Sequence, residues 1–172
     1  MKGLHADAIT LIKRLRPLYK KTKLTVEATW AFTKDWFITT YDDWSGCALR
    51  IKVDVAEHGG TVLKVYDWKT GKFREEKNDE YVEQLELYAL GALLMFPILT
   101  EVQTQLVCVE HGLTYPTQNG YLTFTRADVP RLTKLWEKRT KAMLNDAKFA
   151  PRPSRDCAYC HFRKANGGPC KF

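Results

Sequence analysis

The segment VYDWKTGK, residues 65–72, carries a carboxylate and an ammonium group two residues apart. Its residue types predict a strand followed by a turn, and alternate residues of a strand share one face. Asp67 and Lys69 therefore continue the apolar face of Leu63 and Val65. Because an unpaired buried charge is costly, a bound cation and an anionic substrate would resolve the conflict. This set suits metal-dependent phosphodiester cleavage, in which carboxylates hold the metal and a lysine orients or activates water.

A second carboxylate, Asp54, lies thirteen residues earlier in a predicted strand. The alternation in this strand places Leu49, Ile51, Val53 and Val55 on one side, and Arg50, Lys52 and Asp54 on the other. Residues 57–60, EHGG, predict a turn that joins this strand to the strand of Asp67 as a hairpin. Two carboxylates brought together in this way would repel unless a cation lay between them. Mg²⁺ or Mn²⁺, which prefer oxygen ligands, fit best.

Three further residues are candidates with a more ordinary alternative. His5 stands at the start of a predicted helix, where a lone histidine is commonly structural. Gln84 and Tyr88 are four residues apart and share one helix face. The ordinary interpretation of this pair is a surface glutamine and a half-buried tyrosine, and the functional one is a polar pair beside the substrate backbone.

Five cysteines are present, and Cys157, Cys160 and Cys170 are concentrated near the end of the chain. The odd number argues against a framework of disulfides. The C-x-x-C spacing is typical of a metal knuckle for Zn²⁺ or a [4Fe–4S] cluster. Three thiolates leave a tetrahedral site one ligand short, which Cys47, Cys108, His161 or an outside group could supply. The alternative is a basic tail with free thiols.

The periodicity of apolar residues predicts a mixture of helices and strands. We expect helices at residues 4–20, 79–95 and 126–145, the last capped by Thr125, and strands at residues 24–32, 36–40, 47–55, around Asp67, 101–109 and 121–125. The strand after the second helix could extend the sheet in parallel. This order predicts an α/β or α+β fold with a sheet flanked by helices.

Composition indicates a globular protein of 172 residues with 45% hydrophobic residues and a net charge of +7. Residues 131–172 contain eleven Lys and Arg against three acidic residues, so the rest of the chain is close to neutral. A basic terminal quarter suggests a polyanionic partner such as nucleic acid, the alternative being a solvated basic helix face. No apolar run has membrane-spanning length, and no signal peptide is evident. We expect a cytoplasmic protein of a bacterium or of a phage-infected cell.

Taken together, these motifs resemble the RecB-like exonuclease branch of the PD-(D/E)xK nuclease superfamily, which includes phage and CRISPR-adaptation nucleases. The resemblance implies a restriction-endonuclease-like α/β core, residues 1–149, with a basic Cys-rich tail, residues 150–172, packed on the same domain. It also implies a Mg²⁺- or Mn²⁺-dependent deoxyribonuclease, an exonuclease that leaves 5′-phosphates on DNA ends or single strands. Recombination, repair or replication would be the process, with other proteins of those processes as partners.

The resemblance also implies residue roles. Metal ligands would be His5, Asp54, Asp67 and the Trp68 carbonyl. Lys69 would position or deprotonate the attacking water. Gln84, Tyr88 and Lys72 would contact DNA.

In cluster-carrying members of the branch an early cysteine precedes the histidine motif and joins the three late ones, and this chain has none before His5. Either an N-terminal piece is missing, or another ligand serves, or the tail binds no cluster. Two other functions stay open: a catalytically silent nucleic-acid-binding module of the same fold, and a zinc-stabilised interaction domain.

Overall fold

The computed structural model describes residues 3–21, 23–116, 120–148 and 150–171. The chain forms two compact units, residues 1–140 and 141–172, which are described separately. The tail boundary that we expect between residues 149 and 150 stays a prediction, and Phe149 lies outside the described residues, as do Met1, Lys2 and Phe172.

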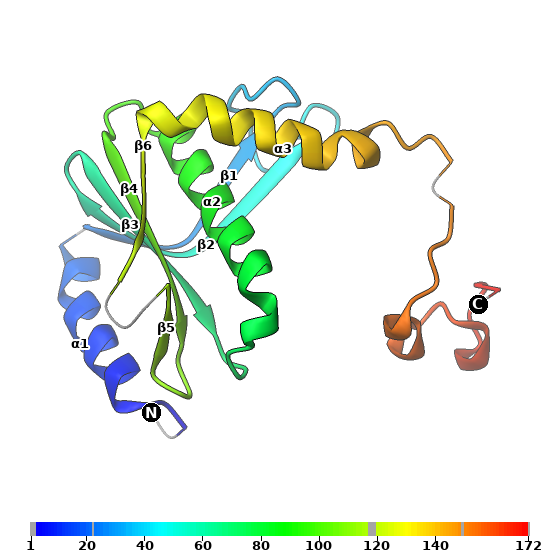
Figure 1. Ribbon diagram of the computed structural model, residues 1–172, viewed down its shortest axis with the longest axis horizontal. Coiled ribbons are helices and arrows are strands. Elements are labelled where there is room, and N and C mark those ends of the chain that lie inside the picture. Colours follow the sequence, from blue (N-terminus) through cyan, green and yellow to red (C-terminus); the bar gives the residue numbers. More distant parts are fainter. Residues whose placement is uncertain (1–2, 22, 117–119, 149, 172) are drawn as a thin grey trace. The chain divides into compact units, whose positions relative to one another are not determined.

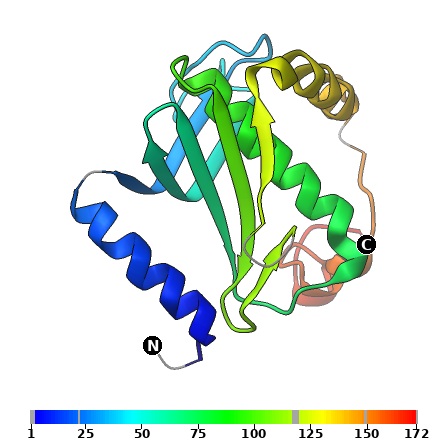
Figure 2. The same cartoon turned by 60° about the vertical axis from the view of Figure 1, so that its left-hand side comes forward.

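The first unit is a mixed sheet with helices on both faces (Figures 1 and 2). Its helices are α1 (Ala6–Lys20), α2 (Asn78–Met95) and α3 (Val129–Leu144), whose last turn passes into the second unit. Its strands are β1 (Leu24–Phe32), β2 (Leu49–Gly59), β3 (Val62–Lys69), β4 (Glu101–Cys108), β5 (Leu113–Tyr115) and β6 (Leu122–Thr125). The expected α/β architecture with a mixed sheet flanked by helices is confirmed.

The strand order is β1-β2-β3-β4-β5, with β6 also pairing with β4. Only the β3–β4 pair is parallel among the described strand pairs. It is parallel because α2 carries the chain back across the sheet between these strands, as expected for a crossover connection. This crossover brings α2 over the carboxyl end of β3, where Asp67 and Lys69 lie.

The two faces of the sheet are covered by different helices. Leu63 and Val65 of β3 pack with α2 residues such as Leu85 and Leu90 in the larger apolar cluster. Tyr66 of β3 packs instead with Ala8 and Leu15 of α1 in a second cluster. Odd-numbered residues of β3 therefore face α2 and even-numbered residues face α1, as the period of a strand requires.

The expected alternation of β2 is wrong at its centre. Ile51 and Val53 belong to the cluster under α2, whereas Val55 belongs to the cluster under α1. The change of face occurs at Asp54, which has no ladder partner in the register with β1. Glu27, on the other side of this gap, has a φ of 53°, a left-handed conformation that interrupts a regular strand. Both strands therefore switch faces together.

Other sequence predictions need smaller corrections. Residues 36–40 form no strand but a loop with one bridge, Phe32 to Ile38. Strand β2 continues to Gly59, so the hairpin turn is tighter than expected. The short strand β5 was not expected. Thr125 begins the turn before α3, where its backbone N–H and its hydroxyl donate to the Asp128 carboxylate at 2.9 and 3.2 Å.

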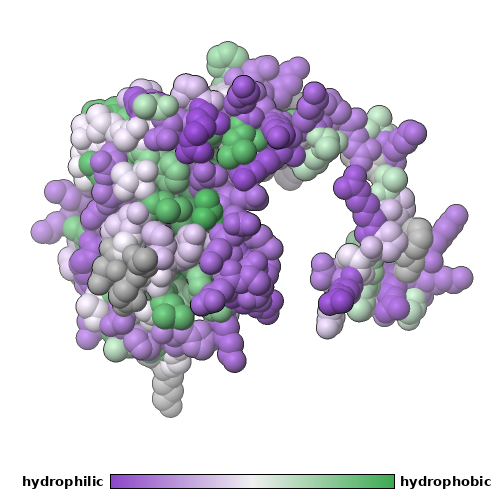
Figure 3. All heavy atoms as spheres, viewed as in Figure 1, coloured by the Kyte–Doolittle hydropathy of each residue, from purple (hydrophilic) through white to green (hydrophobic). Residues whose placement is uncertain are grey.

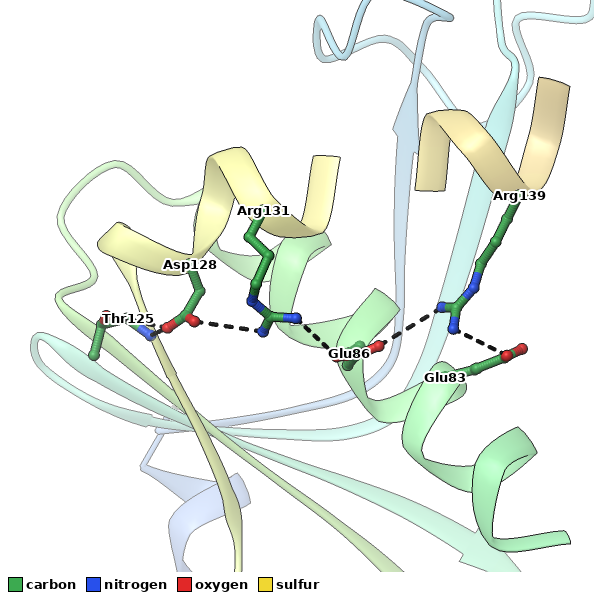
Figure 4. A network of polar contacts seen from close by, with 6 residues as sticks. All are labelled: Glu83, Glu86, Thr125, Asp128, Arg131 and Arg139. Carbon is green, nitrogen blue, oxygen red and sulfur yellow. Dashed lines mark hydrogen bonds and ion pairs between the residues drawn. The ribbon is translucent and has the colours of Figure 1, made fainter. Parts of the chain in front are cut away.

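Helix α3 is joined to α2 by ion pairs that meet at Glu86 (Figure 4). Arg131 and Arg139 approach the two carboxylate oxygens of Glu86 at 3.3 and 3.6 Å, and Arg139 also pairs with Glu83 at 3.0 Å. Only 12% of the Glu86 side chain is exposed, so these pairs are less screened by water than ordinary surface pairs. Two of the arginines of the basic quarter are therefore neutralised within the fold.

The second unit contains short 3₁₀ turns at Arg155–Tyr159 and Lys164–Asn166. The Cys157 sulfur accepts a hydrogen bond from the Ser154 amide at 3.3 Å. The amide of Cys170 donates to the Phe162 carbonyl at 2.8 Å, which brings the end of the chain back onto residues 160–163. All three cysteines of this unit are half-buried and unbridged.

Among the described helices, none is both long and apolar enough to cross a bilayer.

Candidate active site

A polar cluster fills the junction between the end of β3 and the first half of α2. Oδ1 of Asp67 accepts hydrogen bonds from Gln84 Nε2 and from the Tyr88 hydroxyl, each over 3.1 Å. Oε1 of Gln84 accepts from Nζ of Lys69 at 3.0 Å, and Gln84 Nε2 also donates to the Tyr88 oxygen at 2.7 Å. The period of the strand aligns Asp67 with Lys69, and the helical spacing aligns Gln84 with Tyr88.

Asp67 is buried, with 3% of its surface exposed. Its Oδ2 lies 2.7 Å from Nζ of Lys69 and accepts no hydrogen bond in the structure, so the contact is an ion pair without hydrogen-bond geometry. Burial raises the pKa of Asp67 above its usual value; the Lys69 ammonium opposes the shift and the Asp54 carboxylate adds to it. A carboxylate oxygen with unused acceptor capacity is what a hard cation requires.

Asp54 reaches the same strand from the side. Its Oδ2 accepts the backbone N–H of Trp68 at 2.8 Å. The β2–β3 ladder pairs Val55 with Tyr66 and does not include Asp54. The side chain of Asp54 thus takes the place of a backbone partner for Trp68, and the face switch in β2 places its carboxylate beside the residue that follows Asp67.

His5 lies at the same end of the sheet. Its backbone N–H donates to the Val109 carbonyl at 2.8 Å, and the Val109 N–H donates to the Lys69 carbonyl at 3.0 Å. The imidazole packs directly against Gly112, where a Cβ atom would clash with the ring. Nδ1 accepts the Asp7 amide at 3.3 Å as the cap of α1. To accept this bond Nδ1 must carry no proton, whereas a metal bound through Nε2 would leave the proton of a neutral imidazole on Nδ1.

Two more candidate residues lie near the end of β3, in the segment after it and on the neighbouring strand. Lys72 is exposed in the segment after β3, beside a shallow pocket that it forms with Phe73, His111 and Leu113. Cys108 of β4 lies opposite Lys69 in the register and is 1% exposed. Burial raises the pKa of its thiol. The sequence offered Cys108 only as an extra ligand for the tail, because its position beside Lys69 depends on the parallel pairing.

The structure gathers five of the candidates: Asp54, Asp67, Lys69, Gln84 and Tyr88. Among the described residues, the His5 side chain forms no hydrogen bond or ion pair with these five. Within the residues that the structure describes, no group of three or more His, Cys, Asp or Glu side chains is placed to hold a metal ion. The ligand roles of His5 and of the three tail cysteines therefore stay predictions.

The comparison with protein families shows which superfamily the chain belongs to. The model of the PD-(D/E)XK nuclease superfamily matches residues 7–165. The chain belongs to this superfamily. The matched range includes the whole cluster around Asp67, and membership of this superfamily implies a nuclease. Nucleases of the superfamily usually use Mg²⁺ or Mn²⁺.

No curated protein matches this nuclease. Among solved structures, the crystal structure of SSO0001 is similar over 96% of this chain and 68% of its own, with 15% sequence identity and a TM-score of 0.43.

Sequence reasoning missed a second polar network, on the α1 face of the sheet. Arg14 donates to both oxygens of Glu57 at 3.0 and 2.9 Å and to the Tyr66 hydroxyl at 2.7 Å. The Tyr66 hydroxyl also contacts Glu57 and Tyr121. The only signal in the sequence was a tyrosine within an apolar strand. The network holds α1 against the strand that carries Asp67.

Proposed function

We propose that this protein is a metal-dependent DNA exonuclease of the RecB-like branch, which leaves 5′-phosphate products in recombination, repair or replication. The proposal is carried by one observation, the hydrogen-bonded cluster in which Asp67, Lys69 and Gln84 contact one another at the end of β3. An isolated buried carboxylate would be destabilising, whereas a carboxylate that binds a cation has a reason to be there.

The donor set fits a hard divalent cation. The carboxylates of Asp54 and Asp67 and the carbonyl of Trp68 are the proposed ligands, with His5 as a further one after a change of tautomer. The unused Oδ2 of Asp67 supports this assignment. When bound, Mg²⁺ or Mn²⁺ polarises the scissile phosphate and lowers the pKa of a water molecule.

Lys69 is the proposed positioning group for the attacking water. Its Nζ is held between Oδ2 of Asp67 and Oε1 of Gln84, at 2.7 and 3.0 Å. Because only the contact to Gln84 is a hydrogen bond, two of the three donors of the ammonium group remain for a water or a phosphate oxygen. As this water attacks phosphorus and gives up a proton, the bond from phosphorus to the 3′ oxygen breaks and that oxygen takes up a proton, which leaves a 5′-phosphate and a 3′-hydroxyl.

Gln84 and Tyr88 support the site in a way that the sequence did not predict. Both touch the Asp67 carboxylate, and Tyr88 is only 7% exposed. We therefore propose that both residues position Asp67 and Lys69. As an additional proposal, Gln84 and Lys72 contact DNA.

Over α3 the surface is mainly hydrophilic (Figure 3), and the exposed Lys134 and Lys138 are the proposed contacts to the DNA backbone.

The tail cysteines are the proposed ligands of a Zn²⁺ ion or an iron–sulfur cluster. Cys157 lies within the 3₁₀ turn Arg155–Tyr159 and Cys160 follows its end, and the backbone returns Cys170 to residues 160–163. Anaerobic purification followed by metal analysis and a visible absorption spectrum tests this separately from nuclease activity. Iron with visible absorption bands indicates a cluster, and zinc indicates a zinc knuckle. If the protein contains neither iron nor zinc, the proposal is contradicted.

The exonuclease assignment is tested with DNA that has no ends. We expect linear single strands, labelled at either end, to be degraded with Mn²⁺ or Mg²⁺ and to survive in EDTA. Closed circular single strands of the same sequence should survive under all conditions. Cleavage of the circle at a similar rate would show an endonuclease. Binding of DNA without cleavage under any metal would favour the silent module.

A further inference from the structure

An apolar groove runs between α1 and the β1 side of the sheet. Its volume is about 510 Å³. Leu15, Arg16 and Tyr19 of α1 form one wall, and Val55, Trp68 and Val109 contribute to the floor. Tyr19 is 57% exposed, so an aromatic face is open to a ligand. Such an open apolar surface is typical of a binding site.

The groove reaches the carboxyl end of β3 on the α1 face of the sheet, whereas the side chains of Asp67 and Lys69 lie on the α2 face. Its floor residue Trp68 stands between Asp67 and Lys69 in the chain, with its N–H bound by Asp54. Val109, which lines the same end, accepts the N–H of His5 and donates to the carbonyl of Lys69. A strand lying in the groove would therefore have to pass around the end of β3, from the α1 face to the α2 face, to reach Asp67 and Lys69.

The rim of the groove is strongly basic. Residues 13–23 contain six Lys and Arg, and no acidic residue lies between Asp7 and Glu27. Lys13, Arg16 and Lys20 recur at spacings of three and four, so they share the helix face beside the groove. In the part of the chain that the structure describes, these three exposed residues have no ion-pair partner. Arg14, by contrast, is paired with Glu57.

We propose that this groove binds the single-stranded DNA that enters the nuclease site, with bases against Tyr19 and Trp68 and phosphates on the rim of Lys13, Arg16 and Lys20. This inference rests on the proposed function and names the substrate strand for that site. Aromatic platforms beside a cationic track are the recurring solution for binding single strands without sequence preference.

Size and charge favour this occupant. From Ile12 to Tyr19 the helix rises about 10 Å, which spans about three stacked nucleotides. A second copy of the chain would bring two equally basic rims together, which electrostatic repulsion opposes. A DNA strand instead supplies both the negative charge for the rim and flat apolar rings for the groove.

Binding is measured in EDTA, so that no strand is cut, by the anisotropy of a labelled 12-mer single strand and of the matching duplex. The variants are Tyr19→Ser and Arg16→Gln, each with a control of the same chemistry in the loop after β1, Phe37→Ser and Lys34→Gln. Phe37 is 71% exposed and Lys34 is also exposed, so neither control disturbs the core.

We expect Tyr19→Ser to weaken single-strand binding by about fivefold or more, because loss of one stacking platform is worth at least that. Arg16→Gln should weaken it and lower the salt dependence of binding. Duplex binding should change less for Tyr19→Ser, and the controls should match the wild type. The inference is overturned if both variants bind the single strand with unchanged affinity. It is also overturned if the loss of affinity is the same for the duplex and for the control variants. If Tyr19→Ser changes the sedimentation of the protein but not its affinity for DNA, the groove is a contact between copies of the chain, and the inference is also overturned.

The proposed function is checked in parallel with a chromogenic phosphodiester too small to occupy the groove. Wild-type hydrolysis with Mn²⁺ that disappears in Lys69→Ala supports the chemistry whatever the groove binds. If the wild type hydrolyses nothing but binds single strands through Tyr19 and Arg16, the nuclease proposal fails and the groove assignment stands.

Discussion

The carboxamide of Gln84 donates a hydrogen bond to Oδ1 of Asp67 over 3.1 Å. The oxygen of the same carboxamide accepts from Lys69, so one side chain of α2 is bonded to both charged residues of β3. A glutamine is neutral and has both a donor and an acceptor, which lets it bond both groups without adding charge. The relationship makes α2 part of the proposed catalytic unit.

Replacing Gln84 by methionine tests this role. The substitution keeps the size of the side chain and removes its bonds to Asp67 and Lys69. We expect kcat on single-stranded DNA to fall by about 10- to 100-fold, with KM nearly unchanged, because orientation of the reacting groups is lost. A raised KM with unchanged kcat would instead identify Gln84 as a DNA contact only.

Tyr88→Phe should alter the pH dependence of cleavage. Burial raises the pKa of Asp67, and the hydrogen bond from Tyr88 opposes that shift. Without the hydroxyl the pKa of Asp67 rises further, so the carboxylate ionises at a higher pH. The acid limb of the kcat/KM profile should therefore move to higher pH, and kcat at neutral pH should fall by about tenfold or less. A limb that stays in place or moves to lower pH would contradict the link.

Asp67→Asn should stabilise the fold while abolishing cleavage. The raised pKa means that the folded protein disfavours the ionised carboxylate. The ionised group therefore destabilises the fold at pH values above its folded pKa, and this cost fades as the pH falls towards the usual value of 3.8. In EDTA at neutral pH we expect the variant to melt about 2–4 °C higher, a gain of about 1 kcal/mol.

Mn²⁺ provides the matched comparison. It should raise the melting temperature of the wild type and leave that of Asp67→Asn nearly unchanged, because binding to the folded state alone stabilises it. A variant that melts lower than the wild type in EDTA at neutral pH would contradict the account of Asp67.

Glu86→Gln should loosen α3. The two arginines that meet at Glu86 lose a partly buried charged partner, and we expect a loss of about 1–2 kcal/mol in the free energy of unfolding by urea. Glu137→Gln, an exposed position on α3, is the control and should change stability by less than about 0.5 kcal/mol. Equal effects of the two substitutions would show that the ion pairs in Figure 4 contribute no stability.

Much of this fold follows from local pattern. The period of two in β3 and the helical spacing in α2 predict which side chains share a face. The first prediction is confirmed by the packing of Leu63 and Val65, and the second by the contacts of Gln84 and Tyr88 with Asp67. The parallel pairing of β3 with β4 follows from the helix between them. These features depend on residues near one another in the chain, where period and length decide the outcome.

Other features depend on contacts that no local pattern encodes. The face switch at Asp54 needs Glu27 of a neighbouring strand in a left-handed conformation. The bonds from Gln84 and Tyr88 to Asp67 depend on how α2 crosses the sheet, so the sequence suggested a helix face exposed to substrate. His5 was expected as a metal ligand, and its role as a helix cap depends on its contacts with Asp7 and Gly112.

The central claim is that Lys69 acts in metal-dependent DNA cleavage. The most direct measurement is the rate of digestion of an end-labelled single strand by the wild type, Lys69→Ala and Lys64→Ala, each with Mn²⁺ and with EDTA. Lys64 lies on the same strand with its ammonium over the Tyr121 ring, which makes it a matched control. We predict cleavage by the wild type and Lys64→Ala only with Mn²⁺, and a loss of at least about 100-fold in Lys69→Ala, with DNA still bound. Cleavage by Lys69→Ala at the wild-type rate would contradict the account.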